Sequence, residues 1–282
     1  MTGKAVIVTG GASGIGRALV TCLVEQGHQV LVADIDDKQG HALVQELTGG
    51  INPVYPCVAY THCDVTDPTA FAELFEHGTK LFGAVHALVN NAGIAQTHEF
   101  WLAPQWIKTI QVNLTATIAG TTAAIQHFTS QGIAGSVVNI SSIAGLIPFE
   151  GEPVYAATKA GVLNFTRSLK MYAPLMGVRV NAVCPAFVDT PMLTKLSQLS
   201  PAHEASLAQT NKLSPTDVVD SIIRCMDDTT LAGDILVVPY NRAPTTLGVD
   251  SNVIGLLTDS LPPMPTPTAA EAPPRAKVEL KS

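Results

Sequence analysis

The sequence predicts an α/β protein with one doubly wound parallel sheet of about seven strands and helices on both faces. Short β-branched and apolar runs alternate with longer segments of helical periodicity, and such connections are right-handed crossovers between parallel strands. Hydrophobic residues make up 46% of the 282 residues and charged residues only 14%, as expected for a sheet buried on both sides. The length suits one large domain, and the sequence shows no internal repeat.

The strands are placed by the β-branched runs and the helices by the segments between them. The runs predict strands at residues 5–8, 29–33, within 54–63, and at 87–89, 136–140, 178–183 and 234–238. Helical patterns lie at residues 14–26, 37–47, 68–81, 104–130, 154–172 and 217–226. The polar segment 191–211 is also helical in character and is interpreted as a mobile lid.

The chain divides into a domain at residues 1–245 and a C-terminal extension at residues 246–282. From about residue 262 the extension reads PPMPTPTAAEAPPRAKVELKS, which is rich in Pro and Ala and poor in large apolar residues. This composition predicts disorder.

Composition and charge exclude several classes of function. A formal net charge of −7 argues against a nucleic-acid surface or a basic membrane patch. No signal peptide or bilayer-spanning run is visible, so we expect a cytoplasmic protein. The 5 cysteines contain no C-x-x-C pair and read as reduced thiols, and the 8 histidines show no metal-ligand spacing. No metal is therefore expected.

A glycine-rich segment follows the first predicted strand and precedes a helix. Residues 9–16 read TGGASGIG, with the spacing G-x-x-x-G-x-G. Glycines permit a tight turn and close approach of the main chain to a phosphate, and the positive helix end would face a pyrophosphate. Such a motif is loose, and a turn without a ligand is the alternative.

Asp34 ends the second predicted strand, where a carboxylate can accept hydrogen bonds from the ribose hydroxyls of a dinucleotide. It would repel the 2′-phosphate of NADP, and Asp36 and Asp37 add to this negative field. These residues predict NAD as the cofactor. The alternative is that Asp34 only ends a strand, as Asp commonly does.

Three polar residues suggest chemistry on a hydroxyl or carbonyl group. Ser142 follows the strand at 136–140, at the sheet edge where ligands bind in open α/β folds. Tyr155 and Lys159 stand four apart on one helix face, and an ammonium should lower the tyrosine pKa from about 10. Tyr155 could then serve as general acid or base for an alcohol/ketone couple. Taken singly, the three residues could equally be a helix cap, a half-buried tyrosine and a solvated lysine.

These motifs together resemble the short-chain dehydrogenase/reductase family, which has a Rossmann-type fold. The resemblance covers about residues 4–238, and the motifs occur in the family's order. They are TGGASGIG at 9–16, CDV at 63–65, NNAG at 90–93, Asn113, NISS at 139–142, YAATK at 155–159 and CPAFVDT at 184–190.

The resemblance implies a role for each site residue. Ser142 would hydrogen-bond the substrate oxygen and Tyr155 would transfer the proton. Lys159 would hold the ribose and depress the Tyr155 pKa, and Asn113 would support a proton-relay water. The implied cofactor-binding residues are Gly10, Ser13, Gly14, Ile15, Gly16, Asp34, Ile35, Asp64, Val65, Asn91, Tyr155, Lys159, Val188 and Thr190.

Within the family, the stretches SSIAGLIPFEGEPVYAATKAGVLNFTRSL, GVRVNAVCPAFVDT and DDTTLAGDIL look most like those of NAD-dependent 15-hydroxyprostaglandin dehydrogenases. Two departures stand out: Ala186 replaces a usual glycine, and Glu152 replaces a substrate-contacting glutamine. An ionised carboxylate accepts but cannot donate a hydrogen bond, so the substrate contacts should differ. The substrate-binding residues that we expect are Ser142, Phe149, Glu152, Tyr155 and Phe187. Trp101, Trp106, Met192 and Leu193 could line an apolar pocket or belong to ordinary packing.

The resemblance therefore implies an NAD-dependent oxidoreductase that interconverts a secondary alcohol and a ketone on a hydrophobic, lipid-like or polyketide-like molecule. It also implies a homodimer or homotetramer. Two alternatives stay open: a ketone reductase that runs the same site in the opposite direction, and a non-catalytic nucleotide-sensing protein on the same fold.

Overall fold

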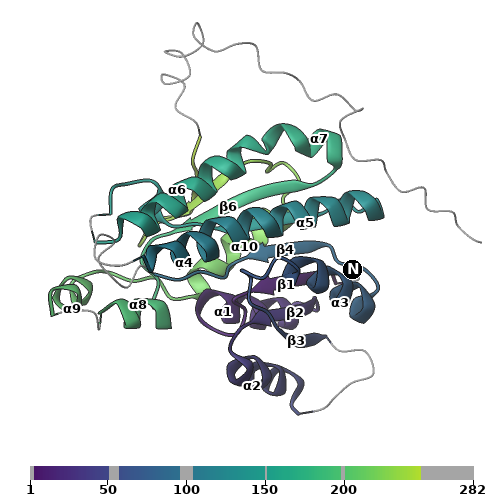
Figure 1. The fold of residues 1–282 in the computed structure, drawn as a ribbon, viewed down its shortest axis with the longest axis horizontal. Helices are drawn as coiled ribbons and strands as arrows, with labels where there is room; N and C mark the ends of the chain where they lie inside the picture. The colour runs from purple at the N-terminus through teal and green to yellow at the C-terminus, as the bar shows by residue number, and fades with distance from the viewer. Residues whose placement is uncertain (1–2, 51–56, 96–103, 150, 198–200, 249–282) are drawn as a thin grey trace, which may run out of the picture.

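The computed structural model describes residues 3–50, 57–95, 104–149, 151–197 and 201–248, which contain one eight-stranded sheet (Figure 1). Its strands run in the order β3-β2-β1-β4-β5-β6-β7-β8, and only the β7–β8 pair is antiparallel. The strands are β1 (Ala5–Thr9), β2 (Gln29–Asp34), β3 (Val58–His62), β4 (Ala87–Asn90), β5 (Ser136–Ile140), β6 (Arg179–Pro185), β7 (Ile235–Val238) and β8 (Thr245–Thr246). The predicted parallel sheet is confirmed, with β8 added as a two-residue edge strand.

The strand order reverses between β1 and β4. From β1 the chain builds outward through β2 and β3, then returns past β1 and continues from β4 to β7. The loops after β1 and β4 therefore leave the sheet in opposite directions, which opens a crevice at the carboxyl ends of these strands.

Helices cover both faces of the sheet, because alternate strand residues point to opposite sides. Val6 and Val8 belong to the core under α1, α2 and α10, whereas Ile7 between them belongs to the core under α3 and α5. Figure 1 shows α5 and α6 running side by side. The longer helices are α1 (Gly14–Glu25), α2 (Asp37–Thr48), α3 (Ala70–Phe82), α5 (Ala116–Gln131), α6 (Pro153–Ser168) and α10 (Thr216–Asp227). None of the helices in the described part of the chain is long and apolar enough to cross a membrane.

Two predicted helices are interrupted. The segment 104–130 forms α4 (Trp106–Ile110), a π-helical turn at Gln111–Thr115, and then α5. The segment 154–172 ends its α-helix at Ser168 and continues as a 3₁₀ turn (Lys170–Tyr172) and α7 (Ala173–Met176). Both interruptions correct the prediction of single continuous helices.

The segment interpreted as a lid is helical, as predicted. It forms α8 (Pro191–Ser197) and α9 (Pro201–Ala208), which lie beyond the sheet in Figure 1. Its mobility remains a prediction, as does the domain boundary near residue 245. The extension predicted to be disordered from about residue 262 lies outside the described residues.

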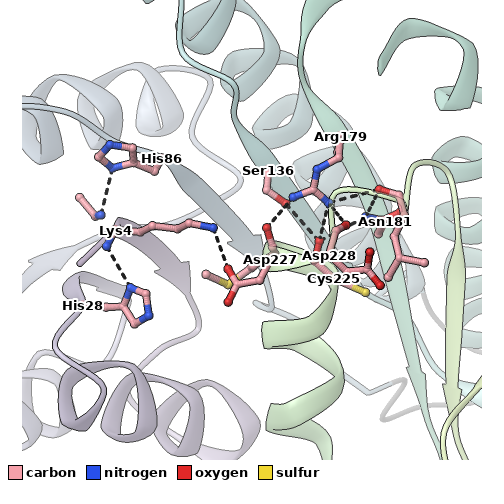
Figure 2. A network of polar contacts seen from close by, with 12 residues as sticks. Lys4, His28, His86, Ser136, Arg179, Asn181, Cys225, Asp227 and Asp228 are labelled. Atoms are coloured by element: carbon pink, nitrogen blue, oxygen red, sulfur yellow. Dashed lines mark hydrogen bonds and ion pairs between the residues drawn. The ribbon is translucent and has the colours of Figure 1, made fainter. Parts of the chain in front are cut away.

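A polar network at the amino-terminal edge of the sheet ties α10 to β6 (Figure 2). The Arg179 guanidinium donates to the main-chain carbonyls of Cys225, Met226, Asp228 and Leu231 at 2.5–3.2 Å. These carbonyls end α10 or follow it, so a cation satisfies acceptors at the negative end of the helix. The network lies at the edge opposite to the crevice.

Candidate active site

A cavity of about 520 Å³ opens at the carboxyl ends of the strands. It is lined by the last residues of β2, β5 and β6, by the loops that follow β1 to β6, and by residues of the helices around them, including α6 and α8. The structure brings to its wall these residues that the sequence predicted: Gly10, Ser13, Gly14, Ile15, Asp34, Ile35, Asp64, Val65, Asn91, Ser142, Phe149, Glu152, Tyr155, Lys159, Phe187, Val188 and Thr190. Gly16 and Asn113 were predicted as well, but they lie behind the wall.

The glycine loop is held tightly against β4. Gly10 has φ +61°, and a Cβ there would lie 2.8 Å from the Cα of Ala92. A Cβ at Gly16 would overlap the carbonyl oxygen of Gly10. The amide of Asn91 donates to the carbonyls of Thr9 and Gly10, both at 2.9 Å, so the end of β4 fixes the loop. The loop thus presents main-chain groups to the cavity with no side chain in between.

Asp34 is anchored at the end of the cavity that lies beside β2. Its Oδ2 accepts the N–H of Ala12 at 3.0 Å, and its Oδ1 accepts the N–H of Asp36 at 3.1 Å. Asp64 lies on the same wall, where hydrogen bonds from Thr66 and the nearby Lys108 lower its carboxyl pKa. This end of the cavity therefore carries fixed negative charge.

Ser142 and Tyr155 meet at the other end of the cavity. Ser142 stands just after β5, and its Oγ accepts the N–H of Ala144 at 3.2 Å, which starts a 3₁₀ turn. Tyr155 lies in the first turn of α6, and a hydrogen bond with Ser142 favours its phenolate. The two hydroxyls can therefore contact one substrate oxygen.

Lys159 is buried behind the tyrosine, with only 4% of its surface exposed. Its Nζ lies 5.6 Å from the centre of the Tyr155 ring and donates to the carbonyl of Ile140 at 2.9 Å. Burial lowers the pKa of Lys159 to about 8. Gly93 lies beside this ammonium: a Cβ there would be 3.6 Å from Nζ, an ordinary van der Waals contact.

The pKa of Tyr155 departs from the sequence-based expectation. Burial and the negative charge of Glu152 raise it above its ordinary value, and the hydrogen bond with Ser142 lowers it only in part. The predicted net lowering of the Tyr155 pKa is therefore wrong for this arrangement of protein groups. Lys159 Nζ lies 5.6 Å from the ring centre and donates to the carbonyl of Ile140, and its positive charge does not offset burial and Glu152. The four-residue spacing predicted that Lys159 lies near Tyr155. It could not predict that Tyr155 is buried or that Glu152 raises its pKa.

Asn113 lies in the π-helical turn and is 1% exposed. Its Oδ1 accepts the N–H of Ile94 and its Nδ2 donates to the Ile94 carbonyl, both at 2.9 Å. Turns of this kind occur often at functional sites, because they displace one residue from the regular helical ladder. Asn113 therefore supports the cavity wall beside Lys159 rather than lining it.

The substrate side of the cavity is largely apolar. Phe149 and Phe187 lie with ring centres 5.9 Å apart and an interplanar angle of 51°. Met192 and Leu193 of α8 also line the cavity, whereas Trp106 does not. Trp101 lies outside the described residues. Ala186 has no positive φ, and its N–H donates to Val238 at 2.9 Å, so the replacement of glycine strains nothing here.

Some wall residues were missed. The loop after β4 contributes Ala92, Ile94 and Ala95 to the cavity, and α8 contributes Lys195 and Leu196. The loop could have been found, because the carboxyl end of β4 borders the point where the strand order reverses. Nothing in the local sequence distinguishes Lys195 and Leu196 from other residues of a polar helix.

This fold and cavity define a nucleotide-dependent dehydrogenase, and comparison with known proteins gives the family. The model of the short chain dehydrogenase family matches residues 4–201. The chain belongs to this family and is an alcohol dehydrogenase or reductase.

Curated relatives agree with this assignment. A mouse protein named 15-hydroxyprostaglandin dehydrogenase [NAD(+)] is 33% identical over 255 residues, which cover 86% of this chain and 92% of the relative. The human protein of the same name is 37% identical over 202 residues, covering 70% and 73%. A 3-alpha-(or 20-beta)-hydroxysteroid dehydrogenase of Mycobacterium bovis is 36% identical over 194 residues, covering 68% and 72%.

Proposed function

We propose that this enzyme uses NAD to interconvert a secondary alcohol and a ketone on a hydrophobic small molecule. One observation carries the proposal: Tyr155 meets Ser142 and has Lys159 one turn away, in a cavity that continues to the glycine loop and Asp34. The catalytic group would be Ser142, Tyr155 and Lys159, with Asn113 in support.

The residues present fit a dinucleotide. The main-chain groups of the glycine loop and the start of α1 suit a pyrophosphate, because both offer N–H donors and positive helix-end charge. The Asp34 carboxylate suits two ribose hydroxyls and would repel a 2′-phosphate, which supports NAD rather than NADP. NAD, when bound, supplies the acceptor for the hydride and a positively charged ring.

The protein's own groups would handle the substrate oxygen and its proton. In the oxidative direction Ser142 donates a hydrogen bond to the substrate oxygen, and Tyr155 as phenolate takes the hydroxyl proton while the C–H bond breaks. The buried Lys159 ammonium stabilises the phenolate through its positive charge. In the reductive direction the neutral Tyr155 returns the proton to the oxygen.

The apolar wall supports a hydrophobic substrate. Phe149, Phe187, Met192 and Leu193 line the same cavity as Tyr155, and apolar area of this kind favours a hydrocarbon skeleton. The relatives are named for hydroxyprostaglandins and hydroxysteroids, which are both lipid alcohols.

We also propose a cytoplasmic homodimer or homotetramer. The long helices α5 and α6 pack against each other along one face and are the candidate contact surface between subunits. Size-exclusion chromatography with light scattering measures the mass directly, and a monomer at all concentrations would contradict this part of the proposal.

A substrate panel tests the function. Hydroxylated lipids and aliphatic secondary alcohols are incubated with NAD or NADP, and the absorbance of the reduced cofactor is followed. We expect turnover of apolar secondary alcohols with a clear preference for NAD. Turnover of none of them would contradict the activity, and a preference for NADP would contradict the role of Asp34. Asp34→Ser should weaken the preference for NAD, whereas Asp220→Asn on the outer face of α10 should not.

A further inference from the structure

Tyr60 stands behind the turn that carries Asp34. It lies in β3, at the edge of the sheet, where it pairs in register with Val32 of β2. Its hydroxyl donates to the main-chain carbonyl of Asp34 at 2.8 Å and to Oδ1 of Asp37 at 2.7 Å. Asp34 is the last residue of β2 and Asp37 is the first residue of α2. One hydroxyl therefore contacts both ends of the turn that joins this strand to this helix.

The turn forms part of the cavity wall, whereas Tyr60 does not. Asp34, Ile35 and Asp36 line the cavity, and neither Tyr60 nor Asp37 is among the lining residues. The Asp34 carboxylate depends on the shape of the turn, because one of its two main-chain donors is the N–H of Asp36. Tyr60 can therefore influence a ligand in the cavity only through this turn.

The ring of Tyr60 is held in one place by α2. A Cβ at Gly40 would overlap the ring, so the helix backbone lies directly against it. His41 of the same helix packs edge-on, with ring centres 4.8 Å apart and an interplanar angle of 66°. Tyr60 also packs against the core under α1, α2 and α10. This packing gives the hydroxyl a defined position relative to the turn.

The protonation states suit a lasting hydrogen bond between Tyr60 and Asp37. Burial and the bond to Asp37 raise the pKa of the Tyr60 phenol above its ordinary value, so the hydroxyl remains a donor. Hydrogen bonds from Tyr60 and His62 lower the pKa of the Asp37 carboxyl, so it remains an ionised acceptor. Hydrogen bonds to an ionised group are stronger than those between neutral groups.

We propose that Tyr60 is a positioning residue for the cofactor: by linking Asp34 to Asp37, its hydroxyl holds the turn in the shape that lets the Asp34 carboxylate bind ribose hydroxyls. This inference rests on the proposed function, in which Asp34 binds the adenosine ribose of NAD. Tyr60 itself touches neither cofactor nor substrate in this scheme. It acts on the affinity for the ribose and not on the proton transfer.

Tyr60→Phe tests the proposal, because it keeps the packed ring and removes only the hydroxyl. The Kd values of NAD and of its analogue without the 2′-hydroxyl of the adenosine ribose are measured by fluorescence titration. In the wild type the analogue should bind about 10- to 100-fold more weakly, as expected for a lost hydrogen bond to a charged group. In Tyr60→Phe this ratio of Kd values should fall by about 3- to 10-fold. At saturating NAD, kcat should stay close to that of the wild type.

A double-mutant cycle shows whether Tyr60 acts through Asp34. Asp34→Ser removes the carboxylate and should itself lower the ratio. Adding Tyr60→Phe to this variant should lower the ratio no further, because the group that Tyr60 positions is gone. An equal fall in both backgrounds would overturn the proposal.

Two variants at Asp37 separate the hydrogen bond from the charge. Asp37→Asn keeps an oxygen that accepts from Tyr60 and removes the negative charge, so the ratio should stay close to that of the wild type. Asp37→Ala removes the acceptor and should lower the ratio, which also provides the test if Tyr60→Phe does not fold. An Asp37→Ala protein that folds, as judged by its melting temperature, and keeps the wild-type ratio would overturn the proposal. Tyr240→Phe, which follows β7 and is 39% exposed, is the control and should change nothing.

The possible failures are distinct. If the wild type binds NAD more tightly than the analogue and Tyr60→Phe keeps that ratio, the inference about Tyr60 is overturned and the proposed function stands. If the wild type binds both equally but oxidises alcohols with NAD, the inference is overturned together with the role of Asp34, and the activity stands. If the wild type does not bind NAD, both the inference and the proposed function are overturned.

Discussion

The side-chain amide of Asn113 forms two hydrogen bonds with the main chain of Ile94: its Oδ1 accepts the N–H and its Nδ2 donates to the carbonyl, both at 2.9 Å. The contact joins the π-helical turn to the loop after β4, where Ile94 lines the cavity. A Cβ at the neighbouring Gly93 would lie 3.4 Å from Asn113 Oδ1 and 3.6 Å from Lys159 Nζ. The asparagine thus fixes the part of the cavity wall that lies beside Lys159.

Asn113→Asp tests this support with almost no change of shape. The carboxylate still accepts from the Ile94 N–H but cannot donate to its carbonyl, and it brings a charge into a buried place. We expect the free energy of unfolding to fall by about 1–3 kcal/mol and kcat/KM to fall by at least about 10-fold. Urea denaturation and steady-state kinetics measure both. Asn164→Asp on the exposed face of α6 is the control, and equal behaviour of the two variants would contradict the role of Asn113.

The pH dependence of oxidation should follow Tyr155. Its pKa lies above the ordinary value because of burial and the charge of Glu152, and the other groups that face it are Ser142, Cys184 and Lys159. In the proposed reaction the phenolate is the base, so kcat/KM for oxidation should rise with pH through this pKa. Glu152→Gln removes the negative charge and lowers the pKa, so the rise should move to lower pH. A rise that stays in place or moves upward in the variant would contradict the effect of Glu152.

His86 should make the fold sensitive to acid. Its Nδ1 accepts the N–H of Ala5 at 3.1 Å, which requires a neutral ring. Figure 2 shows His86 close to Lys4. Burial and the nearby Lys4 lower its pKa below the ordinary 6.5. As pH falls below 6.5, His86 therefore takes up a proton in the unfolded chain before it does so in the folded protein. Its contribution to the free energy of unfolding is complete above pH 6.5 and is lost as pH falls toward the pKa of the folded state.

His86→Asn keeps an acceptor close to the position of Nδ1 but cannot titrate. The free energy of unfolding of this variant, measured by denaturation at several pH values, should fall less between pH 7 and pH 5 than that of the wild type. The same decline in both proteins would show that His86 does not cause it.

Arg179 should matter for stability and not for catalysis. Its guanidinium satisfies four carbonyls at the end of α10, at the sheet edge opposite to the cavity. Arg179→Lys keeps the charge, but an ammonium carries its three donors on one nitrogen. It cannot reproduce the planar arrangement of N–H donors by which the guanidinium reaches all four carbonyls. We expect a loss of about 1.5–3 kcal/mol in unfolding free energy with kcat unchanged. Arg242→Lys, at an exposed position, is the control and should change neither the unfolding free energy nor kcat. A loss of kcat in Arg179→Lys would contradict the prediction, because it would mean that the Arg179 hydrogen bonds affect the active site.

The parallel sheet was predictable because its strands are short, apolar and separated by helical patterns. The π-helical turn was not, because Gln111–Thr115 has no local signal for an extra residue in the helix. Its shape depends on the contact of Asn113 with Ile94, which is 19 residues away in sequence. Likewise β8 is two residues long and forms only by pairing with β7.

The candidate site was predictable where residue type and sheet position agree. Asp34 is the last residue of a strand, Ser142 and Val188 come just after strands, and the structure places all three in the lining of one cavity. The electrostatics were not predictable in the same way. Burial and the negative charge of Glu152 raise the pKa of Tyr155, and neither can be predicted from the spacing of Tyr155 and Lys159.

Tyr155→Phe tests the central claim most directly, because it removes one oxygen atom and leaves the ring in place. With an oxidisable alcohol and NAD, kcat should fall by about 10²- to 10⁴-fold, while the Kd for NAD measured by fluorescence titration stays close to that of the wild type. Wild-type turnover by this variant would contradict the assignment of Tyr155 as the proton-transferring group.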